Sequence, residues 1–409
     1  MDTPDVAIVG GGIAGGAAAV ALTSAGLDVL VLERQVEYHD HVRGEIIWPW
    51  GVRAARALGV EQVLTDGGGL FVDTFDLYDE GSPEPLRLNL GEAVPEVRGS
   101  LNIPHPRACL ALADAAAASG AVIRTGVRDV HASPGDPPCL RWADVDGRHR
   151  KTTCRLLVGA DGRRSLVRAQ AGIRLEADPP AHLVAGMLAD SIPGLDVAVN
   201  VLARERDLIF YSFPQQDGKA RLYLSFPNGQ SRRFAGADRA MRFLATSALG
   251  CLAGVAEWAS AQPAGPCATF PGEDSRTASP VADGLALIGD AAGYENPLQG
   301  QGLSMALQDA HDLTACVLSG NGTADLTEYA RLRARRKRLV DLSTVVEVWT
   351  HQGCIAQDPA ERAARVEHVE ADDVLAMLEL SFMTGYDRLP PDLTQADVDE
   401  RLASYGRLR

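Results

Sequence analysis

Residues 5–33 read DVAIVGGGIAGGAAAVALTSAGLDVLVLE, and the rest of the chain is best understood by working outward from them. Gly10, Gly12 and Gly15 have the spacing G-x-G-x-x-G, and Glu33 follows eighteen positions after the last of them. Glycines at this spacing permit a tight turn, a close approach of the backbone to a pyrophosphate, and close packing of a helix on a strand. The pattern therefore predicts a dinucleotide site, with the acid placed to accept hydrogen bonds from a ribose.

The residues around these glycines predict a strand, a helix and a second strand. Val6–Val9 and Val29–Leu32 are short apolar runs rich in β-branched residues, which is typical of buried parallel strands. Between them, residues 17–25 have the alanine-rich composition of a helix, and Gly26 suits its C-cap. The N-terminus of such a helix offers unpaired N–H groups and a partial positive charge to phosphates.

The composition excludes several classes of protein. A chain of 409 residues with 46% hydrophobic and 23% charged residues suits two globular domains or one large discontinuous domain. The net charge of −15 argues against binding to nucleic acid or to an anionic membrane surface. Seven scattered cysteines without a CxxC pair favour free thiols over a disulfide framework or a metal site. No apolar run has transmembrane length, and the first strand leaves no room for a signal peptide, so we expect a cytoplasmic protein.

The hydrophobic period changes in the middle of the chain. Between about 180 and 230, apolar residues alternate with a period of two in several runs separated by turn residues, which predicts antiparallel strands. We therefore expect an α/β fold in which a sheet is inserted into a Rossmann-like domain. The expected parts are a discontinuous dinucleotide-binding domain at 1–70, 100–180 and 270–340, a substrate-binding β-sheet domain at 71–99 and 181–269, and a helical C-terminal segment at 341–409.

A helix is also predicted at 328–349, with basic residues at 331, 333 and 335–338. A run of charge on a helix is usually a solvated face, and we predict that here.

Two further motifs lie downstream of the first. They are LVGADGRRSLVR at 157–168 and LIGDAAG at 287–293, and the second continues to Pro297 and to Gly300-Gln301-Gly302. A strand that ends in Gly-Asp, as at Asp290, can offer its carboxylate to a ribityl hydroxyl. A helix that begins near Gly302 can direct N–H groups at the electron-rich end of an isoalloxazine. A nicotinamide cofactor does not need this second acid, so the three motifs together indicate FAD.

In this order and at this spacing, the three motifs resemble the fingerprints of the flavin-dependent aromatic hydroxylase superfamily, which has the p-hydroxybenzoate hydroxylase fold. That superfamily also contains epoxidases, halogenases and geranylgeranyl reductases. The resemblance covers residues 1–60, 100–170 and 280–320. It implies a discontinuous FAD-binding domain of this type with an inserted sheet. Gly293 and Ser304 stand where many hydroxylases carry His and Asn.

The resemblance also implies roles for individual residues. The expected FAD-binding residues are Gly10, Gly12, Ile13, Ala14, Gly15, Glu33, Arg34, Arg43, Arg107, Asp161, Gly162, Gly289, Asp290, Pro297, Gly302 and Leu303. The backbone of Pro297, Gly300, Gln301 and Gly302 is expected beside the flavin, where oxygen reacts. No motif supports a side-chain acid or base. His105, His182, Tyr211 and Tyr223 are candidates for substrate contact, although an ordinary packed or surface role is commoner for each residue type.

The activity that the resemblance implies is that of an NAD(P)H-dependent monooxygenase. Reduced FAD, formed by NAD(P)H or by a partner flavin reductase, reacts with O2 to give a C4a-hydroperoxide, which hydroxylates or epoxidises a small organic substrate. An aromatic compound or another natural product is expected, and the protein is expected to be a monomer or a homodimer. The alternatives are a FAD-dependent reductase or dehydrogenase, a halogenase and a non-catalytic redox sensor. Halogenation is disfavoured because no lysine precedes Lys151 and because Trp48-Pro49-Trp50 lies at a different place from the halogenase motif.

Overall fold

A six-stranded, mainly parallel sheet forms the base of the molecule in the computed structural model, which describes residues 3–42, 44–80, 82, 84–320, 326–352 and 359–405. The strands, in spatial order, are β19 (Val281–Ala282), β20 (Leu285–Leu287), β12 (Leu156–Gly159), β1 (Val6–Val9), β2 (Val29–Leu32) and β8 (Val122–Arg124). β1 pairs in parallel with β12 and β2, and every residue of these three strands is buried. The two apolar runs of the first motif therefore form adjacent buried parallel strands, as predicted.

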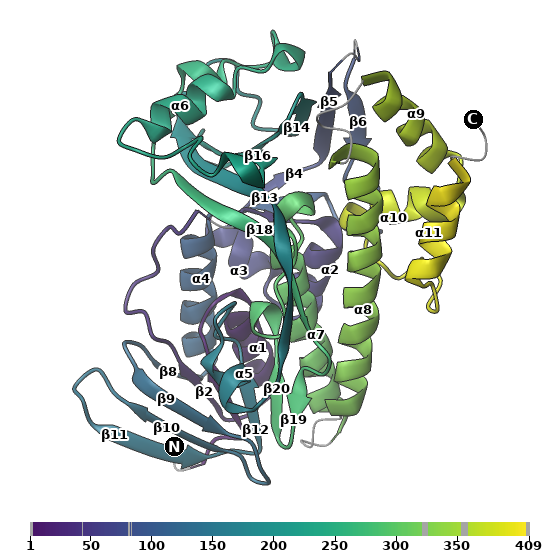
Figure 1. Ribbon diagram of the computed structural model, residues 1–409. Coiled ribbons are helices and arrows are strands. Elements are labelled where there is room, and N and C mark those ends of the chain that lie inside the picture. The colour runs from purple at the N-terminus through teal and green to yellow at the C-terminus, as the bar shows by residue number, and fades with distance from the viewer. Residues whose placement is uncertain are drawn as a thin grey trace.

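Helices on one face of this sheet pack closely on one another. They are α1 (Ile13–Ser24), α2 (Pro49–Ala57), α3 (Glu61–Asp66), α4 (His105–Ala118) and α7 (Gly302–Ser319), whereas α5 (Leu166–Gln170) contributes to the core on the opposite face. α1 lies between α4 and α7 (Figure 1). A Cβ at Gly16 would lie 2.9 Å from the Cβ of Leu112 on α4, so the glycine sets the close spacing of these two helices.

A larger sheet lies above the first (Figure 1). Its strands are β17 (Gln262–Pro263), β13 (Leu175–Asp190), β16 (Ala220–Pro227), β15 (Leu208–Pro214), β14 (Val199–Glu205), β5 (Thr74–Asp79) and β6 (Leu86–Asn89), with β18 (Ala268–Thr277) paired to β13. All of its pairings are antiparallel except that of β14 with β5. The α/β fold with an inserted antiparallel sheet is therefore confirmed, and the exact boundaries of the three parts stay a prediction.

The two faces of the large sheet pack against different cores. On β16, Leu222 and Leu224 join the outer core beneath α6 (Arg239–Thr246), whereas Tyr223 joins the main core on the opposite face. On β15, Phe210 points outward and Tyr211 inward in the same way. This alternation is the period of two in the sequence, and the structure identifies which set of residues faces the interior.

The remaining strands form two small sheets. One contains β9 (Arg128–Ser133), β10 (Cys139–Ala143) and β11 (His149–Thr153) and lies at one end of the molecule (Figure 1). The other contains β3 (Ile46–Ile47), β7 (Ser100–Asn102) and β4 (Leu70–Val72).

The C-terminal region is helical, as predicted. α8 (Leu326–Glu347) runs along the molecule and ends in a π-helical turn, Val348–Gln352, before α9 (Pro359–Glu370), α10 (Asp373–Thr384) and α11 (Gln395–Ser404) (Figure 1). α10 docks against the main body, where the indole N–H of Trp50 donates to the carbonyl of Phe382 at 2.8 Å. Among the residues described, no helix combines the length and the apolarity that crossing a membrane requires.

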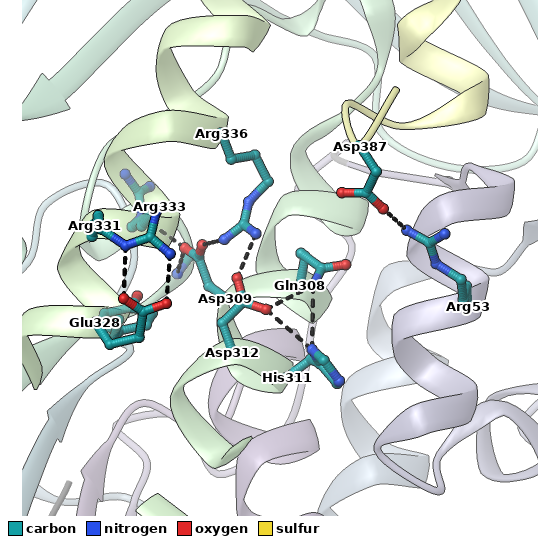
Figure 2. A network of polar contacts seen from close by, with 12 residues as sticks. Arg53, Gln308, Asp309, His311, Asp312, Glu328, Arg331, Arg333, Arg336 and Asp387 are labelled. Carbon is teal, nitrogen blue, oxygen red and sulfur yellow. Dashed lines mark hydrogen bonds and ion pairs between the residues drawn. The ribbon is translucent and has the colours of Figure 1, made fainter. Parts of the chain in front are cut away.

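The prediction of a solvated basic face on α8 is wrong for part of that face. Arg331 is exposed, but Arg333, Arg336 and Lys337 have side chains only 3%, 11% and 5% exposed. α8 packs against α7, and the acids Asp309 and Asp312 of α7 point toward it (Figure 2). The cations are buried because they have buried carboxylate partners.

Candidate functional site

One cavity of about 1420 Å³ connects the first motif with the inner face of the large sheet and with the C-terminal helices. Its lining begins at Gly10 and Glu33, passes Asp290, and reaches Tyr223 and Phe382 at the other end. The three sequence motifs therefore meet along a single space.

The glycine turn after β1 has two glycines that packing requires and one that it does not. Gly10 has φ +107°, and a Cβ there would lie 2.2 Å from the carbonyl oxygen of Ala160. A Cβ at Gly15 would lie 2.0 Å from the carbonyl oxygen of Gly10. A Cβ at Gly12, which lines the cavity, would meet no atom within 4 Å. The free space therefore lies over the N-terminus of α1, where a phosphate group is stabilised.

Glu33 is held in place at the end of β2. Its Oε2 accepts the backbone N–H of Gly11 and its Oε1 accepts the N–H of Gln35, both at 2.7 Å. Each carboxylate oxygen has a further lone pair for a ribose hydroxyl. Tyr38 closes this corner by donating its hydroxyl to the carbonyl of Gly11 at 2.7 Å, and burial together with the charge of Glu33 raises the pKa of that phenol. Arg34, Ile13 and Ala14 line the same part of the cavity.

The second motif lines the cavity and also ties two elements together. Asp161 caps α5, since its carboxylate accepts the hydroxyl of Ser165 and the N–H groups of Leu166 and Val167. Gly162 adopts φ +78° beside it, and both residues line the cavity. Arg168 is buried and donates to the carbonyl of Ala291 at 2.8 Å, which joins this motif to the third.

The Gly289-Asp290 turn is supported from behind by a buried ion-pair network. The N–H of Gly289, at φ +57°, donates to Oδ2 of Asp309 at 2.9 Å. Asp309 in turn contacts Arg333 at 2.9 Å and Arg336 at 3.0 Å (Figure 2). The network fixes the backbone that presents Asp290 to the cavity.

The loop after the third motif has an open backbone and anchored ends. Pro297–Gln299 forms a 3-10 turn, Gly300 follows at φ +62°, and α7 begins at Gly302, where a Cβ would meet nothing within 4 Å. The carbonyls of Leu298 and Gln299 accept the Tyr211 hydroxyl at 2.8 Å and the Trp48 indole N–H at 2.7 Å.

Of the residues predicted in this loop, all but one line the cavity. Pro297, Gly300, Gly302 and Leu303 do so. Gln301 is buried instead, and its side chain bonds Gln299 and Tyr386.

The remaining residues predicted to contact FAD or substrate differ in whether they line the cavity. Arg43 lies outside the described residues. Arg107 is half exposed, is absent from the cavity lining and approaches Asp217 at 4.0 Å, so its contact with FAD stays a prediction. His105 lines the cavity at the start of α4, with its Nδ1 3.6 Å from the sulfur of Cys109.

Of the other three candidate substrate contacts, two line the cavity and one does not. Tyr211 and Tyr223 line the cavity from the inner face of the sheet, and the Tyr223 hydroxyl has no hydrogen-bond partner among the described residues. His182 does not line the cavity. It is buried against Gly272, and burial lowers the pKa of its imidazole to about 4.

Beside Tyr223, Glu45 lines the cavity as a buried carboxylate. It accepts hydrogen bonds from Gln215 at 2.9 Å and from Arg221 at 3.1 Å. Burial raises the pKa of Glu45 to about 8, although the charge of Arg221 opposes the shift.

Several lining residues carry no sequence signal. Trp48, Phe75 and Phe382 form an aromatic cluster, with ring centroids 4.8–6.2 Å apart. Beyond them lie polar residues from β14, α8, the π-helical turn and α10, namely Arg204, Glu347, His351 and Glu379. Arg204 contacts Glu347 at 3.3 Å, and His351 contacts Glu379 at 3.2 Å. They come from distant elements, so spacing in the sequence does not reveal them.

Comparison with known proteins agrees with this architecture. A family model described as "FAD binding domain" matches residues 3–343. The 6-methylpretetramide 4-monooxygenase of Streptomyces rimosus is 28% identical over 88% of this chain and 87% of its own length. The dialkyldecalin synthase of Streptomyces rugosporus is 30% identical over 75% of this chain and 64% of its own. The chain spans only 58–64% of the full length of three of the curated relatives, the dialkyldecalin synthase among them. The solved ternary complex of aklavinone-11 hydroxylase with FAD and aklavinone has a TM-score of 0.72, with 20% identity over 87% of this chain and 70% of that one.

Proposed function

The chain belongs to the FAD-binding family whose model spans residues 3–343, and from that premise we propose that it is a FAD-dependent monooxygenase acting on a large, mostly apolar natural product. One observation carries this proposal. A single cavity joins the glycine turn at the N-terminus of α1 to the apolar inner face of the large sheet. A cofactor and a substrate can therefore lie end to end in one continuous space.

The shape of the cavity fits FAD at both ends of the cofactor. The open space at Gly12 suits the pyrophosphate, Glu33 suits the adenosine ribose and Asp290 suits the ribityl chain. The open space at Gly302 suits the flavin ring, beside Pro297. The remaining cofactor contacts proposed are Gly10, Ile13, Ala14, Gly15, Arg34, Arg43, Arg107, Asp161, Gly162, Gly289 and Leu303.

Bound FAD supplies the redox chemistry, with O2 as the second substrate and NAD(P)H, or a partner flavin reductase, as the proposed source of electrons. The chain's own residues orient the reactants and exclude water. The N-terminus of α7 is placed to stabilise negative charge near Gly302, because its first N–H groups have no partner within the helix. The hydrogen bonds from Tyr211 and Trp48 hold the carbonyls of the preceding turn, so that this N-terminus keeps its position.

The chamber walls indicate the class of substrate. Val184, Leu202, Tyr211, Phe213 and Tyr223 present apolar or aromatic surface from the sheet. Phe75, also from the sheet, adds to this surface together with Trp48 and Phe382. Aromatic walls favour a ring-containing substrate, and the name 6-methylpretetramide 4-monooxygenase of one relative supports a polycyclic one. The four polar residues beyond Phe382 suit a polar group at the far end of that molecule.

The proposal is tested with purified protein and a panel of polycyclic aromatic polyketides and linear polyprenes. We expect a yellow, FAD-containing protein in which a polycyclic compound stimulates NAD(P)H oxidation and gains one oxygen atom from labelled O2. Asp290→Ala should lose FAD, whereas the exposed-surface variant Asp387→Asn should not. Conversion of a substrate without label in the product would contradict oxygen insertion and favour the reductase or dehydrogenase alternative.

A second candidate function is ring formation without net oxidation. The observation that favours it is the 30% identity to a protein named dialkyldecalin synthase. In that case the product would be an isomer of the substrate, would contain no label and would form without consumption of NAD(P)H.

A further inference from the structure

A buried lysine on α8 lies among three carboxylates behind the proposed flavin site. Nζ of Lys337 is 2.7 Å from Asp274 on β18 and 3.1 Å from Glu295, and it also contacts Asp341 one turn along α8. Carboxylate oxygens of the three acids lie within 4.8 Å of one another, and the lysine ammonium fills the position that a cation would otherwise take.

This cluster reaches both the cavity and the surface. Glu295 lines the large cavity and lies two residues before Pro297. Lys337 and Asp341 line a separate hollow of about 280 Å³ on the other side. That hollow is at the surface, because Ala334 and Arg338 in its wall are exposed. The cluster is therefore a continuous line of titratable groups from solvent to the site.

The charges of the cluster do not balance if every acid is ionised. Three carboxylates face one ammonium, and the nearest further cation, Arg333, is paired with Asp309. Arg276, beside Asp341 in the surface hollow, pairs with Asp178. Burial, with the neighbouring carboxylates, raises the pKa values of Glu295 and Asp274, while Lys337 opposes the shift. Glu295 has no hydrogen bond within the described residues besides its ion pair, so a proton on it is free to move.

A monooxygenase reaction needs a supply of protons at its site. When NAD(P)H and O2 convert RH to ROH, the products are NAD(P)+ and water, and one proton is taken from solution in each turnover. Glu295, which lines the cavity two residues before Pro297, is placed to deliver this proton. This step of the inference rests on the proposed function.

We propose that Asp341, Lys337 and Glu295 relay a proton from the surface hollow to the cavity, with Asp274 holding the lysine in position. Once Glu295 has released its proton to the cavity, Lys337 passes a proton to the Glu295 carboxylate and, in the same concerted step, accepts one that solvent delivers through the Asp341 carboxylate. One N–H and one O–H bond break, one of each forms, and no electron is transferred. Lys337 therefore remains protonated after the step.

The test follows the Glu295 proton by infrared spectroscopy, with and without FAD and with no turnover. Beside the C=O bands of other buried carboxyls such as Glu45, which both proteins share, the wild-type protein should show a C=O band that Glu295→Gln lacks. After transfer into D2O, the band should shift at least about tenfold more slowly in Asp341→Asn than in wild type. Asp387→Asn, an exposed acid-to-amide control, should behave as wild type, and thermal unfolding confirms that each variant is folded.

Two results would overturn the relay. One is the absence of any C=O band that wild type shows and Glu295→Gln lacks, and the other is unchanged deuterium exchange in both Asp341→Asn and Lys337→Met. Either would leave the cluster as an ion-pair network that only joins β18 to α8. Failure of oxygen insertion with the exchange results as expected would instead contradict the proposed function and leave the proton path intact.

Discussion

Gly10 and Gly12 lie two positions apart and have different physical reasons to be glycine. Gly10 has a left-handed backbone and no room for a Cβ, whereas Gly12 has an ordinary negative φ and open space. The absence of a side chain is needed for folding at Gly10 and for ligand binding at Gly12. Sequence inspection finds both but does not separate the two reasons.

We expect Gly10→Ala to destabilise the FAD-free protein by at least about 2 kcal/mol, because it adds backbone strain and a contact with Ala160. Gly12→Ala should change the stability by less than about 0.5 kcal/mol, yet weaken FAD binding about tenfold or more, since its methyl group occupies the phosphate space. Denaturant unfolding and FAD titration measure the two effects. Equal loss of stability in both variants would contradict this division.

His182 should make stability depend on pH. Its imidazole has a pKa of 6.5 in the unfolded chain and about 4 in the fold, where neither ring nitrogen has a hydrogen-bond partner among the residues that the structure describes. Between these pH values the unfolded chain binds a proton that the folded chain does not, so the free energy of unfolding falls as pH falls. The loss attributable to this group is on the order of 3 kcal/mol.

The check on this prediction is urea unfolding between pH 8 and pH 4. His182→Leu should flatten the decline below pH 6.5, whereas His149→Leu, at an exposed position, should keep the wild-type decline. A decline that is identical in wild type and His182→Leu would show that other groups cause the acid sensitivity.

At the scale of elements, α8 shows what the charge pattern of a helix predicts and what it does not. Its basic residues predict a solvated face, and Arg331 lies on such a face, but Arg333 and Arg336 do not. The error has a physical cause. The charge pattern of a helix identifies its polar face but not the acids that a neighbouring helix brings to it, here Asp309 and Asp312 (Figure 2).

Arg333→Met should therefore destabilise the protein by about 3–5 kcal/mol, because it leaves Asp309 buried with less compensation. Arg331→Met, whose partner Glu328 is at the surface, should cost less than about 1 kcal/mol. Denaturant unfolding of the two variants measures the difference. A small effect for Arg333→Met, comparable to that of Arg331→Met, would mean that Arg336 alone suffices for Asp309.

At the scale of the whole molecule, the cavity unites parts that are distant in the chain. Its wall includes the turn after β1, the inner face of the large sheet and α10. The main core likewise contains Val6 of β1 and Phe382 of α10. The C-terminal helices are thus part of one folded body.

Calorimetry should therefore show a single unfolding transition. FAD at a free concentration one hundred times its dissociation constant should raise the free energy of unfolding by about 2.7 kcal/mol. The whole transition should move, since the FAD-binding turns and α10 share one core. A second transition that does not respond to FAD would show that the C-terminal helices unfold independently.

The sequence by itself determined the cofactor family, the α/β fold with its inserted sheet and most of the residues that line the cofactor half of the cavity. It could do so because each motif is local: a strand, its glycines and its acid lie within about thirty residues, and short-range geometry specifies the turn. The tertiary structure alone decided which sheet face is inward, the Trp48–Gln299 contact, the buried cations of α8 and the proton path through Lys337. These depend on contacts between elements that are distant in the chain, and no local spacing encodes them.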